Sequence, residues 1–294
     1  MVIKGTTKLL GVIGYPVEHS FSPLMHNAAI AHLNADYAYL PFPIHPDNLK
    51  AALDGFAAMG LRGFNITIPH KQSILPLLDE VSEVAQAMGA VNTVWRKDDC
   101  WHGTNTDAVG FLAPLKSLDK NWAELPAMVL GNGGAARAVV AACAQLGCPE
   151  IWVVGRSPHK LAQFIESWKA SPDIAARLRS VNWSQMDDYL PKAGLAVNAT
   201  PMGMHPQVAA SPLSEQQVGL MGEGAIAYDL IYTPRPTLFL QQASDVGAIA
   251  IDGLEMLVQQ GAAALEIWLG QPAPVEIMRQ TLLDYLSERH PRSR

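Results

Sequence analysis

The chain has 294 residues, of which 49% are hydrophobic and 16% charged, and its formal net charge at pH 7 is −6. This composition is typical of a globular protein with about two domains and excludes an intrinsically disordered chain. The acidic balance, without a long basic run, argues against a nucleic-acid-binding surface.

Cysteine usage and the N-terminal segment indicate the compartment. Cys100, Cys143 and Cys148 form no C-x-x-C pair and leave one cysteine over from any disulfide. This favours a reducing compartment, and we expect the cytoplasm. Only a short apolar run precedes Tyr15 and Pro16, which argues against a signal peptide, and no stretch of about 18 apolar residues predicts a membrane span.

The first hundred residues alternate strand-like and helix-like segments. The helix that we expect at 22–33 has two start signals, with Ser22 as a candidate N-cap and Pro23 at the first helical position. The other predicted elements are strands at 8–14 and 37–44, helices at 46–60 and near 73–88, and a hairpin at 90–105 with its turn at 97–99.

The segment 63–71, "GFNITIPHK", combines a strand pattern with polar side chains. Apolar residues alternate with Asn65 and Thr67 up to Ile68, and Pro69 then ends the strand. Lys71 follows two residues later. Strand ends carry chemistry where loops leave the sheet at a cleft, so Lys71 is a candidate functional residue.

A second unit begins near Thr106. Its apolar runs are short and continuous, as in buried parallel strands, and they alternate with helical patterns. We expect a helix at 107–118, then a strand, a glycine-rich turn and a helix within 127–147, and a strand and a helix within 150–168. Further strands are expected at 195–200, 225–232 and 248–252, and C-terminal helices at 254–270 and about 274–288. The hydrophobic pattern does not assign the last two helices to either unit.

A glycine-rich turn lies between the first strand and helix of this unit. Gly131, Gly133 and Ala136 match G-x-G-x-x-G/A, in which the glycines permit a tight turn and close approach of a pyrophosphate to the helix start. The alternative is a simple tight strand-to-helix turn. The following strand at the expected distance favours dinucleotide binding.

The end of that following strand indicates which dinucleotide is bound. A site for NAD places an acidic residue there, whereas this chain has Gly155, Arg156 and Ser157, with Lys160 one turn later. A guanidinium can bind a 2′-phosphate through two hydrogen bonds, and a lysine adds charge. The residues therefore favour NADP, and the alternative is a pair of solvated cations.

Eight motifs together resemble the shikimate dehydrogenase family. They follow the family's order and cover the chain from about residue 10 to 270. The motifs are "SFSPLMHN" (20–27), "NITIPHK" (65–71), "GAVNT" (89–93), "NTDAVG" (105–110), "GNGGAARA" (131–138), "NATPMGM" (198–204), "YDLIY" (228–232) and "DGLEMLVQQ" (252–260).

The resemblance implies a fold and an activity. We expect an α/β protein with an N-terminal α/β substrate domain, 1–105 plus 253–294, and a Rossmann-type doubly wound parallel-sheet cofactor domain at 106–252. The implied reaction is the reversible NADPH-dependent reduction of 3-dehydroshikimate to shikimate in aromatic amino-acid biosynthesis. No nucleic-acid or membrane partner is expected, and a homodimer is left open.

The resemblance also implies the site residues. Lys71 matches the family's catalytic lysine and Asp107 its aspartate partner. An acid within reach of the developing alkoxide is what reduction of a ketone by hydride requires. Whether Asp107 acts as a base or positions Lys71 stays open, since a nearby carboxylate would normally raise the pKa of a lysine.

Further residues follow from the same resemblance. Ser20 and Ser22 match carboxylate-binding serines, although alone they would be turn and cap residues. The other implied substrate contacts are Thr67, Asn92, Tyr232 and Gln260, while Asn65 is less certain and could only fix the loop. The implied cofactor contacts are Glu83, Gly131, Asn132, Gly133, Gly134, Ala135, Gly155, Arg156, Ser157, Lys160, Leu230 and Gly253. No spacing around His19, His26 and His70 suggests a metal site.

Two departures from the family pattern and two alternatives qualify these expectations. Ala108 stands where glycine commonly follows the aspartate, and Gly155 stands where asparagine often precedes the arginine. One alternative activity is a quinate/shikimate dehydrogenase that uses NAD. The other is a non-catalytic regulator that binds NADP and a metabolite, against which the retention of Lys71 and Asp107 argues.

Overall fold

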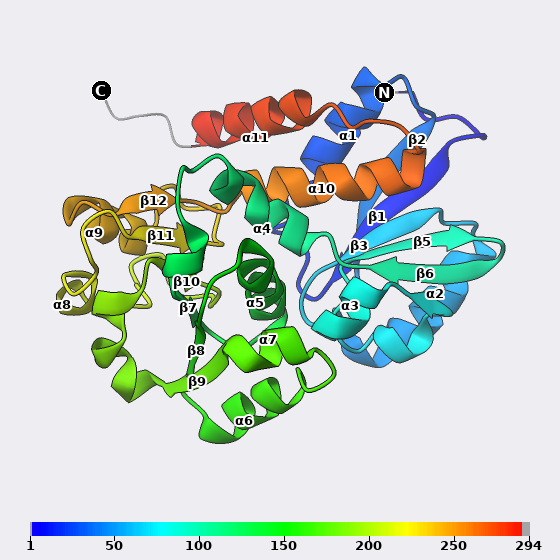
Figure 1. The fold of residues 1–294 in the computed structure, drawn as a ribbon. Coiled ribbons are helices and arrows are strands. Elements are labelled where there is room, and N and C mark those ends of the chain that lie inside the picture. Colours follow the sequence, from blue (N-terminus) through cyan, green and yellow to red (C-terminus); the bar gives the residue numbers. More distant parts are fainter. Residues whose placement is uncertain (1, 290–294) are drawn as a thin grey trace. The chain divides into compact units, whose positions relative to one another are not determined.

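The computed structural model describes residues 2–289, which divide into two units that each contain one six-stranded sheet (Figure 1). Unit 1 comprises the residues up to Thr106 together with those from Leu257 onward, and unit 2 comprises Asp107–Met256. The boundaries expected from the sequence were 105/106 and 252/253. The second boundary of the structure falls within helix α10 (Leu254–Leu269).

The sheet of unit 1 is mixed, with the strand order β2-β1-β3-β5-β6-β4. Strand β1 pairs in parallel with β2 and β3, whereas β5 is antiparallel to both β3 and β6. Its strands are β1 (Lys8–Gly14), β2 (Tyr37–Pro43), β3 (Gly63–Ile66), β4 (Glu80–Val81), β5 (Thr93–Lys97) and β6 (Cys100–Thr104).

The hairpin predicted at 90–105 is confirmed as β5 and β6. Lys97 pairs with Cys100, so that Asp98 and Asp99 alone form the turn. Their φ angles of 50° and 61° are the left-handed values that a two-residue hairpin turn requires, and aspartate tolerates them better than most residues.

The helices of unit 1 pack on this sheet and on each other. Helices α1 and α11, far apart in sequence, lie side by side (Figure 1). This contact assigns the last helix to unit 1, which the hydrophobic pattern alone could not do. The helices are α1 (Ser22–His32), α2 (Leu49–Ala58), α3 (Glu83–Met88), the larger part of α10, and α11 (Val275–Arg289), with short 3-10 turns at Pro46–Asn48 and Leu75–Leu77.

The helix expected near 73–88 is wrong for its first half. Only α3 forms there, after the 3-10 turn and strand β4. Asp79 exchanges two hydrogen bonds with Trp101, its N–H donating to the carbonyl at 3.0 Å and its Oδ2 accepting from the Trp101 N–H at 2.6 Å. Pairing with β6 therefore overrides the helical pattern, and Pro76 already weakens it.

The sheet of unit 2 is entirely parallel, with the strand order β12-β11-β10-β7-β8-β9. Numbered from the first strand of the unit, this is the 3-2-1-4-5-6 order of Rossmann-type sheets. The strands are β7 (Ala127–Leu130), β8 (Ile151–Gly155), β9 (Leu178–Asn182), β10 (Leu195–Asn198), β11 (Ile226–Asp229) and β12 (Ile249–Ile251).

The remaining elements of unit 2 are helices and 3-10 turns. The helices are α4 (Asp107–Lys116), α5 (Gly134–Leu146), α6 (Pro158–Glu166), α7 (Pro172–Arg177), α8 (Glu215–Val218), α9 (Leu238–Asp245) and the start of α10, and the 3-10 turns are Trp122–Glu124, Trp183–Asp188 and Leu190–Lys192. In the part of the chain that the structure describes, no helix is both long enough and apolar enough to cross a membrane.

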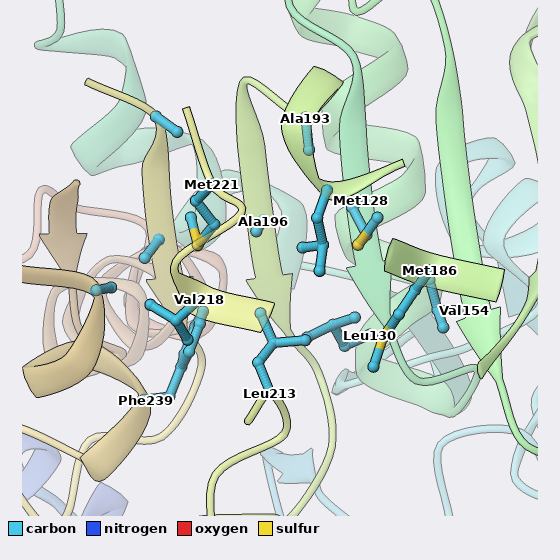
Figure 2. Packing of buried hydrophobic residues seen from close by; sticks show 14 of the residues in the cluster. Met128, Leu130, Val154, Met186, Ala193, Ala196, Leu213, Val218, Met221 and Phe239 are labelled. Carbon is cyan, nitrogen blue, oxygen red and sulfur yellow. The ribbon is translucent and has the colours of Figure 1, made fainter. Parts of the chain in front are cut away.

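The core of unit 2 forms where α8, α9 and their connections cover the sheet. Met128 and Leu130 of β7 and Val154 of β8 lie in one buried cluster with Leu213 and Phe239 (Figure 2). All four residues of β7 are buried, and strands buried on both faces appear in the sequence as continuous apolar runs rather than as alternating patterns.

Candidate active site

The Lys71 loop leaves the sheet of unit 1 earlier than the sequence predicts. Strand β3 ends at Ile66 rather than Ile68, so the alternation of faces does not extend to Thr67. The loop still follows the end of β1, because the Thr67 N–H donates to Ile13 O at 2.9 Å and Ile68 O accepts from the Tyr15 N–H at 3.0 Å. Thr67 is half-buried.

Two further contacts hold the loop around Lys71. The His70 side chain is fully buried, and its Nε2 lies 2.7 Å from the Ile44 carbonyl oxygen. The Lys71 carbonyl accepts from the Val91 N–H at 2.8 Å, which places the lysine backbone beside the segment that leads into Asn92. The half-buried Lys71 therefore stands on an anchored loop. Sequence reasoning missed His70 as an anchor, since it considered histidines only as metal ligands.

Asn65 belongs to a buried hydrogen-bond network instead of facing open space. The Tyr39 hydroxyl donates to Asn65 Oδ1 at 2.7 Å, and Asn65 Nδ2 lies 3.2 Å from both Asn92 O and Thr93 Oγ1. Asn65 is 5% exposed and Tyr39 is fully buried. Asn65 was interpreted either as a substrate contact or as a residue that fixes the loop. These contacts fit the second interpretation.

Asn92 connects this network to Thr106, the last residue of the first segment of unit 1. Its Oδ1 accepts from the Thr106 N–H at 2.8 Å, and its Nδ2 lies 3.0 Å from Thr106 Oγ1 and 3.4 Å from Gln260 Oε1. Gln260 Nε2 donates to the Leu257 carbonyl at 2.8 Å. The structure thus brings Asn92 and Gln260 together, and Asn92 fixes the residue that precedes Asp107 in the chain.

The two serines lie at the start of α1, where one detail of the sequence prediction is wrong. Ser22 is the first helical residue and Phe21 the N-cap, so Pro23 occupies the second helical position. Ser20 Oγ accepts from the Ser22 N–H at 3.3 Å. Burial raises the pKa of Tyr39 well above its usual range, and a hydrogen bond with the Ser22 hydroxyl opposes this only in part. Ser22 therefore belongs to the same buried network.

The other two expected residues of the substrate site lie in unit 2. Asp107 is the first residue of α4 and 5% exposed, and Tyr232 is half-buried in the segment that follows β11. The six remaining expected substrate contacts are Ser20, Ser22, Thr67, Lys71, Asn92 and Gln260, all in unit 1.

The glycine-rich turn follows β7 as predicted. Gly131 has a φ of +108°, and a Cβ there would lie 3.0 Å from the Ala199 carbonyl oxygen, so glycine is required. Gly133 is the N-cap of α5, and within residues 2–289 no side chain caps this helix start. Gly134 and Ala135 form its first turn, with Asn132 just before. The free N–H groups there fit the negatively charged phosphates of a dinucleotide.

The turn after β8 carries the expected cation. Arg156 is exposed directly after the strand, and Ser157 is the N-cap of α6, with its Oγ accepting from the Lys160 N–H at 3.4 Å. Arg156 therefore precedes the helix, and helical spacing does not relate it to Lys160. Gly155 is buried, and a Cβ there would lie 3.0 Å from the Leu161 side chain, so any side chain at this position competes with packing.

Three other expected cofactor residues lie outside the turns that follow β7 and β8. They are Glu83, Leu230 and Gly253. Glu83 is exposed in the first turn of α3, in unit 1. Leu230 follows β11, and its N–H donates to Asn198 O at 3.1 Å. A Cβ on Gly253 would collide with the Leu230 carbonyl oxygen, so these two residues lie against one another and position 253 needs glycine.

Asp229 is a buried acidic residue near these positions that was not identified from the sequence. Asp229, the last residue of β11, accepts from Asn198 Nδ2 and the Ile231 N–H at 3.0 Å and from Thr237 Oγ1 at 2.7 Å. Burial raises the pKa of Asp229 to about 6 despite these three donors. A charged residue inside the apolar run "AIAYDLIY" was the available signal, because such a residue is seldom buried without partners.

Comparison with known proteins gives one result over nearly the whole chain. Residues 12–94 match the model of the shikimate dehydrogenase substrate binding domain, and residues 253–283 match that of the shikimate 5′-dehydrogenase C-terminal domain. A shikimate dehydrogenase (NADP(+)) from Trichormus variabilis is 60% identical over 287 residues, which are 97% of this chain and 99% of that protein.

Solved structures agree with the sequence relatives. A crystal structure of shikimate dehydrogenase in complex with NADP+ has a TM-score of 0.88 and 35% identity, and the match covers 97% of this chain and 98% of that one. The Thermus thermophilus enzyme in complex with NADP(H) and shikimate has a TM-score of 0.83 and 36% identity, over 95% and 99% of the two chains.

The strand order and glycine-rich turn of unit 2 place this protein in the class of α/β dinucleotide-binding proteins with a Rossmann-type sheet. Within that class, the chain belongs to the shikimate dehydrogenase family. Both the predicted fold class and the resemblance stated from the motifs are confirmed.

Proposed function

We propose that this protein catalyses the reversible NADPH-dependent reduction of 3-dehydroshikimate to shikimate, a step in aromatic amino-acid biosynthesis. The observation that carries the proposal is the 60% identity, along nearly both full lengths, to an NADP-dependent shikimate dehydrogenase. The Lys71 motif and the glycine-rich turn, each on the expected element, support it.

Lys71 serves as the proton donor in this proposal. NADPH, when bound, supplies the hydride, and an oxygen that gains negative charge must then be protonated. An ammonium stabilises that charge and transfers its proton. The anchors on its loop, His70 and the Val91 N–H, support the role because a general acid must be held at one position. Asp107 positions Lys71 or a neighbouring hydroxyl of the substrate.

Hydroxyl and amide side chains recognise the substrate, which carries one carboxylate and several hydroxyls. We assign the carboxylate to Ser20 and Ser22. The hydroxyls are assigned to Thr67, Asn92, Tyr232 and Gln260. The network through Tyr39 supports these roles, because it holds Ser22 and Asn92 in place before substrate arrives.

NADP binds to unit 2 in this proposal, with unit 1 as the substrate domain. The residues proposed to hold the pyrophosphate are Gly131, Asn132, Gly133, Gly134 and Ala135, and those for the 2′-phosphate are Arg156, Ser157 and Lys160. Leu230 and Gly253 are further proposed cofactor contacts in unit 2, and Glu83 is a proposed contact in unit 1. The uncapped start of α5 and the exposed Arg156 guanidinium support the fit.

We place the enzyme in the cytoplasm, and three free cysteines, Cys100, Cys143 and Cys148, support a reducing compartment. The expected partner is the small-molecule substrate, with no nucleic acid and no membrane. Size-exclusion chromatography with light scattering would distinguish a homodimer from a monomer.

The decisive experiment is a cofactor-reduction assay with the purified chain. Shikimate and quinate are each supplied with NADP and with NAD, and kcat/KM is determined for the four pairs. We expect shikimate with NADP to give the highest value. A preference for quinate or NAD would favour the alternative dehydrogenase, and no turnover with any pair would favour the regulator.

A further inference from the structure

The loop at 230–236 connects β11 to α9 and contains Tyr232, a proposed substrate contact. Asp229 binds both ends of this loop. Its Oδ1 accepts from the Ile231 N–H at 3.0 Å, and its Oδ2 accepts from Thr237 Oγ1 at 2.7 Å. The base of the 230–236 loop is therefore closed by one buried carboxyl group.

A second carboxylate lies at the same edge of the sheet. Strands β11 and β12 are parallel, and the last pair in their register is Tyr228 with Ile251. The residues that follow this pair are Asp229 and Asp252, so two acidic side chains come at neighbouring strand ends. Burial is the largest cause of the raised pKa of Asp229, and the Asp252 carboxylate acts in the same direction. Two acidic groups so placed favour a cation beside them.

Arg235, in the 230–236 loop, provides that cation. Its Nε donates to Asp252 Oδ2 at 2.5 Å, and the two side chains are 34% and 21% exposed, so much of the pair is out of water. The other carboxylate oxygen, Asp252 Oδ1, accepts from the Leu254 N–H at 2.9 Å. Because this bond fixes the carboxylate at the start of α10, Arg235 ties the loop to an anchored group.

Tyr232 lies in the chain between two attachments of the loop to the segment that follows β12. Before it, the Ile231 carbonyl accepts from the Gly253 N–H at 3.1 Å. After it, Arg235 binds the carboxylate described above. Prolines on both sides of Arg235 fix two further φ angles. The backbone that carries Tyr232 therefore has few alternative conformations while both attachments hold.

We propose that Arg235 and Asp252 are positioning residues for Tyr232 and, through it, for a hydroxyl of the substrate. The proposal rests on the proposed function, in which Tyr232 binds such a hydroxyl. Neither Arg235 nor Asp252 touches the substrate. Their ion pair orders the loop before the substrate arrives, which lowers the entropy cost of binding. Breaking the pair should therefore weaken substrate binding and leave proton transfer from Lys71 unchanged.

Steady-state kinetics with shikimate and saturating NADP test the pair. In Arg235→Gln we expect KM for shikimate to rise about threefold to tenfold and kcat to stay within about twofold. Asp252→Asn removes the charge but keeps an acceptor for the Leu254 N–H, and its KM should rise to a similar extent. The double variant should be no worse than either single variant, because both remove the same interaction.

The hydroxyl of Tyr232 distinguishes positioning from a general loss of stability. In Tyr232→Phe, which lacks this hydroxyl, adding Arg235→Gln should change KM by less than about twofold. The matched control is Arg177→Gln, which removes another arginine of unit 2, one that donates to the Cys148 carbonyl at 2.9 Å. Its KM should stay within about twofold of the unmodified chain. An unchanged KM in Arg235→Gln, or an equal rise with and without the Tyr232 hydroxyl, would overturn the positioning role.

Hydrogen–deuterium exchange tests the anchoring without turnover. In the full chain without ligands, Arg235→Gln should speed amide exchange in a peptide that covers 230–237, whereas Arg177→Gln should not. Unaltered exchange in Arg235→Gln would overturn the anchoring itself. The proposed function fails separately. If the unmodified chain oxidises shikimate while KM in Arg235→Gln is unchanged, only the positioning role is wrong. If shikimate is not oxidised, the proposed function is wrong, and faster exchange in Arg235→Gln would keep the pair as the anchor of this loop.

Discussion

Lys71 gives the most direct test of the proposed chemistry at the scale of a single residue. Replacing Lys71 with Ala should lower kcat by about 10²–10⁴-fold, the usual contribution of a general acid, and change KM for shikimate far less. Steady-state kinetics measure both. Lys97→Ala, an exposed lysine of unit 1, is the control and should behave as the unmodified enzyme. Near-normal turnover of a folded Lys71→Ala protein would remove the proton-donor assignment.

Tyr39 tests whether the buried network holds the substrate domain together. Tyr39→Phe removes the hydroxyl 2.7 Å from Asn65 Oδ1 and leaves that acceptor buried without its donor. The free energy of unfolding, measured with urea, should fall by about 1–3 kcal/mol.

Tyr37→Phe is the matched control on the same strand. Tyr37 is half-buried, and its ring, which lies under the Lys8 ammonium at 5.4 Å, is kept in the variant. Its effect should stay within about 0.5 kcal/mol. Equal losses in the two variants would mean that the Asn65 contact adds nothing specific.

Sequence reasoning identified the residues of this network better than their contacts. Ser22, Asn65, Asn92 and Gln260 could be named from motifs, but the partner of Asn65 is Tyr39, 26 residues away in the chain. A local pattern carries no information on such a pairing, which forms only when β2, β3 and β5 assemble. Tyr39 therefore appeared in the sequence as an ordinary strand residue.

The β8–α6 turn is the element that should set cofactor choice. Arg156→Ala removes a charged donor to the 2′-phosphate, worth about 1.5–3 kcal/mol, so NADP should bind about tenfold to a hundredfold more weakly. NAD carries only a hydroxyl there and should be nearly unaffected. The measurement is the NADP-to-NAD ratio of kcat/KM with shikimate. Arg179→Ala, which removes an exposed cation from neighbouring β9, should leave the ratio unchanged. An equal loss with both cofactors would assign Arg156 to the fold.

Introducing an acidic residue at Gly155 is a less clean test of the same turn. A Cβ at this position already lies 3.0 Å from Leu161, so Gly155→Asp would combine charge with a packing change. Gly155→Ala isolates the packing component.

The end of β11 should make the stability of unit 2 depend on pH. The pKa of Asp229 is raised from 3.8 in the unfolded chain to about 6 in the folded one, mainly by burial. Well below pH 3.8 both states are protonated, and the full contribution to stability is present. As the pH rises toward 6, the unfolded chain ionises first, so this contribution falls by up to about 3 kcal/mol.

Urea unfolding at pH 4, 5, 6 and 7 measures this loss. Asp229→Asn cannot titrate, so the difference in unfolding free energy between the unmodified protein and the variant should decrease with pH mainly between 4 and 6. Parallel profiles would show that Asp229 does not carry the predicted proton.

Most elements could be predicted from the sequence because their signals are local. The strand at 8–14 and the 90–105 hairpin depend on periodicity and turn residues within a few positions. Strand β9 was missed, because "LRSVN" has only two apolar residues and pairs with β8 alone, at the edge of its sheet. The helix predicted for the first half of 73–88 is wrong because the structure there depends on pairing with the distant strand β6, which a local pattern does not show.

At the scale of the whole molecule, the two units divide the proposed ligands between them. Most proposed cofactor residues lie in Asp107–Met256, and six of the eight proposed substrate residues lie in the other unit. A ligand that binds the native state reduces local opening where its contacts are, so each ligand should slow amide exchange mainly in its own unit.

Hydrogen–deuterium exchange on the full chain tests this division. NADP should protect peptides that contain the β7–α5 and β8–α6 turns. Shikimate should protect peptides around Lys71 and Asn92, with the Asp107 and Tyr232 peptides as the expected exceptions in unit 2. In Arg156→Ala, protection by subsaturating NADP should weaken while protection by shikimate is unchanged. If NADP protected only peptides of unit 1, the assignment of the cofactor to unit 2 would be wrong, whatever the turnover of the enzyme.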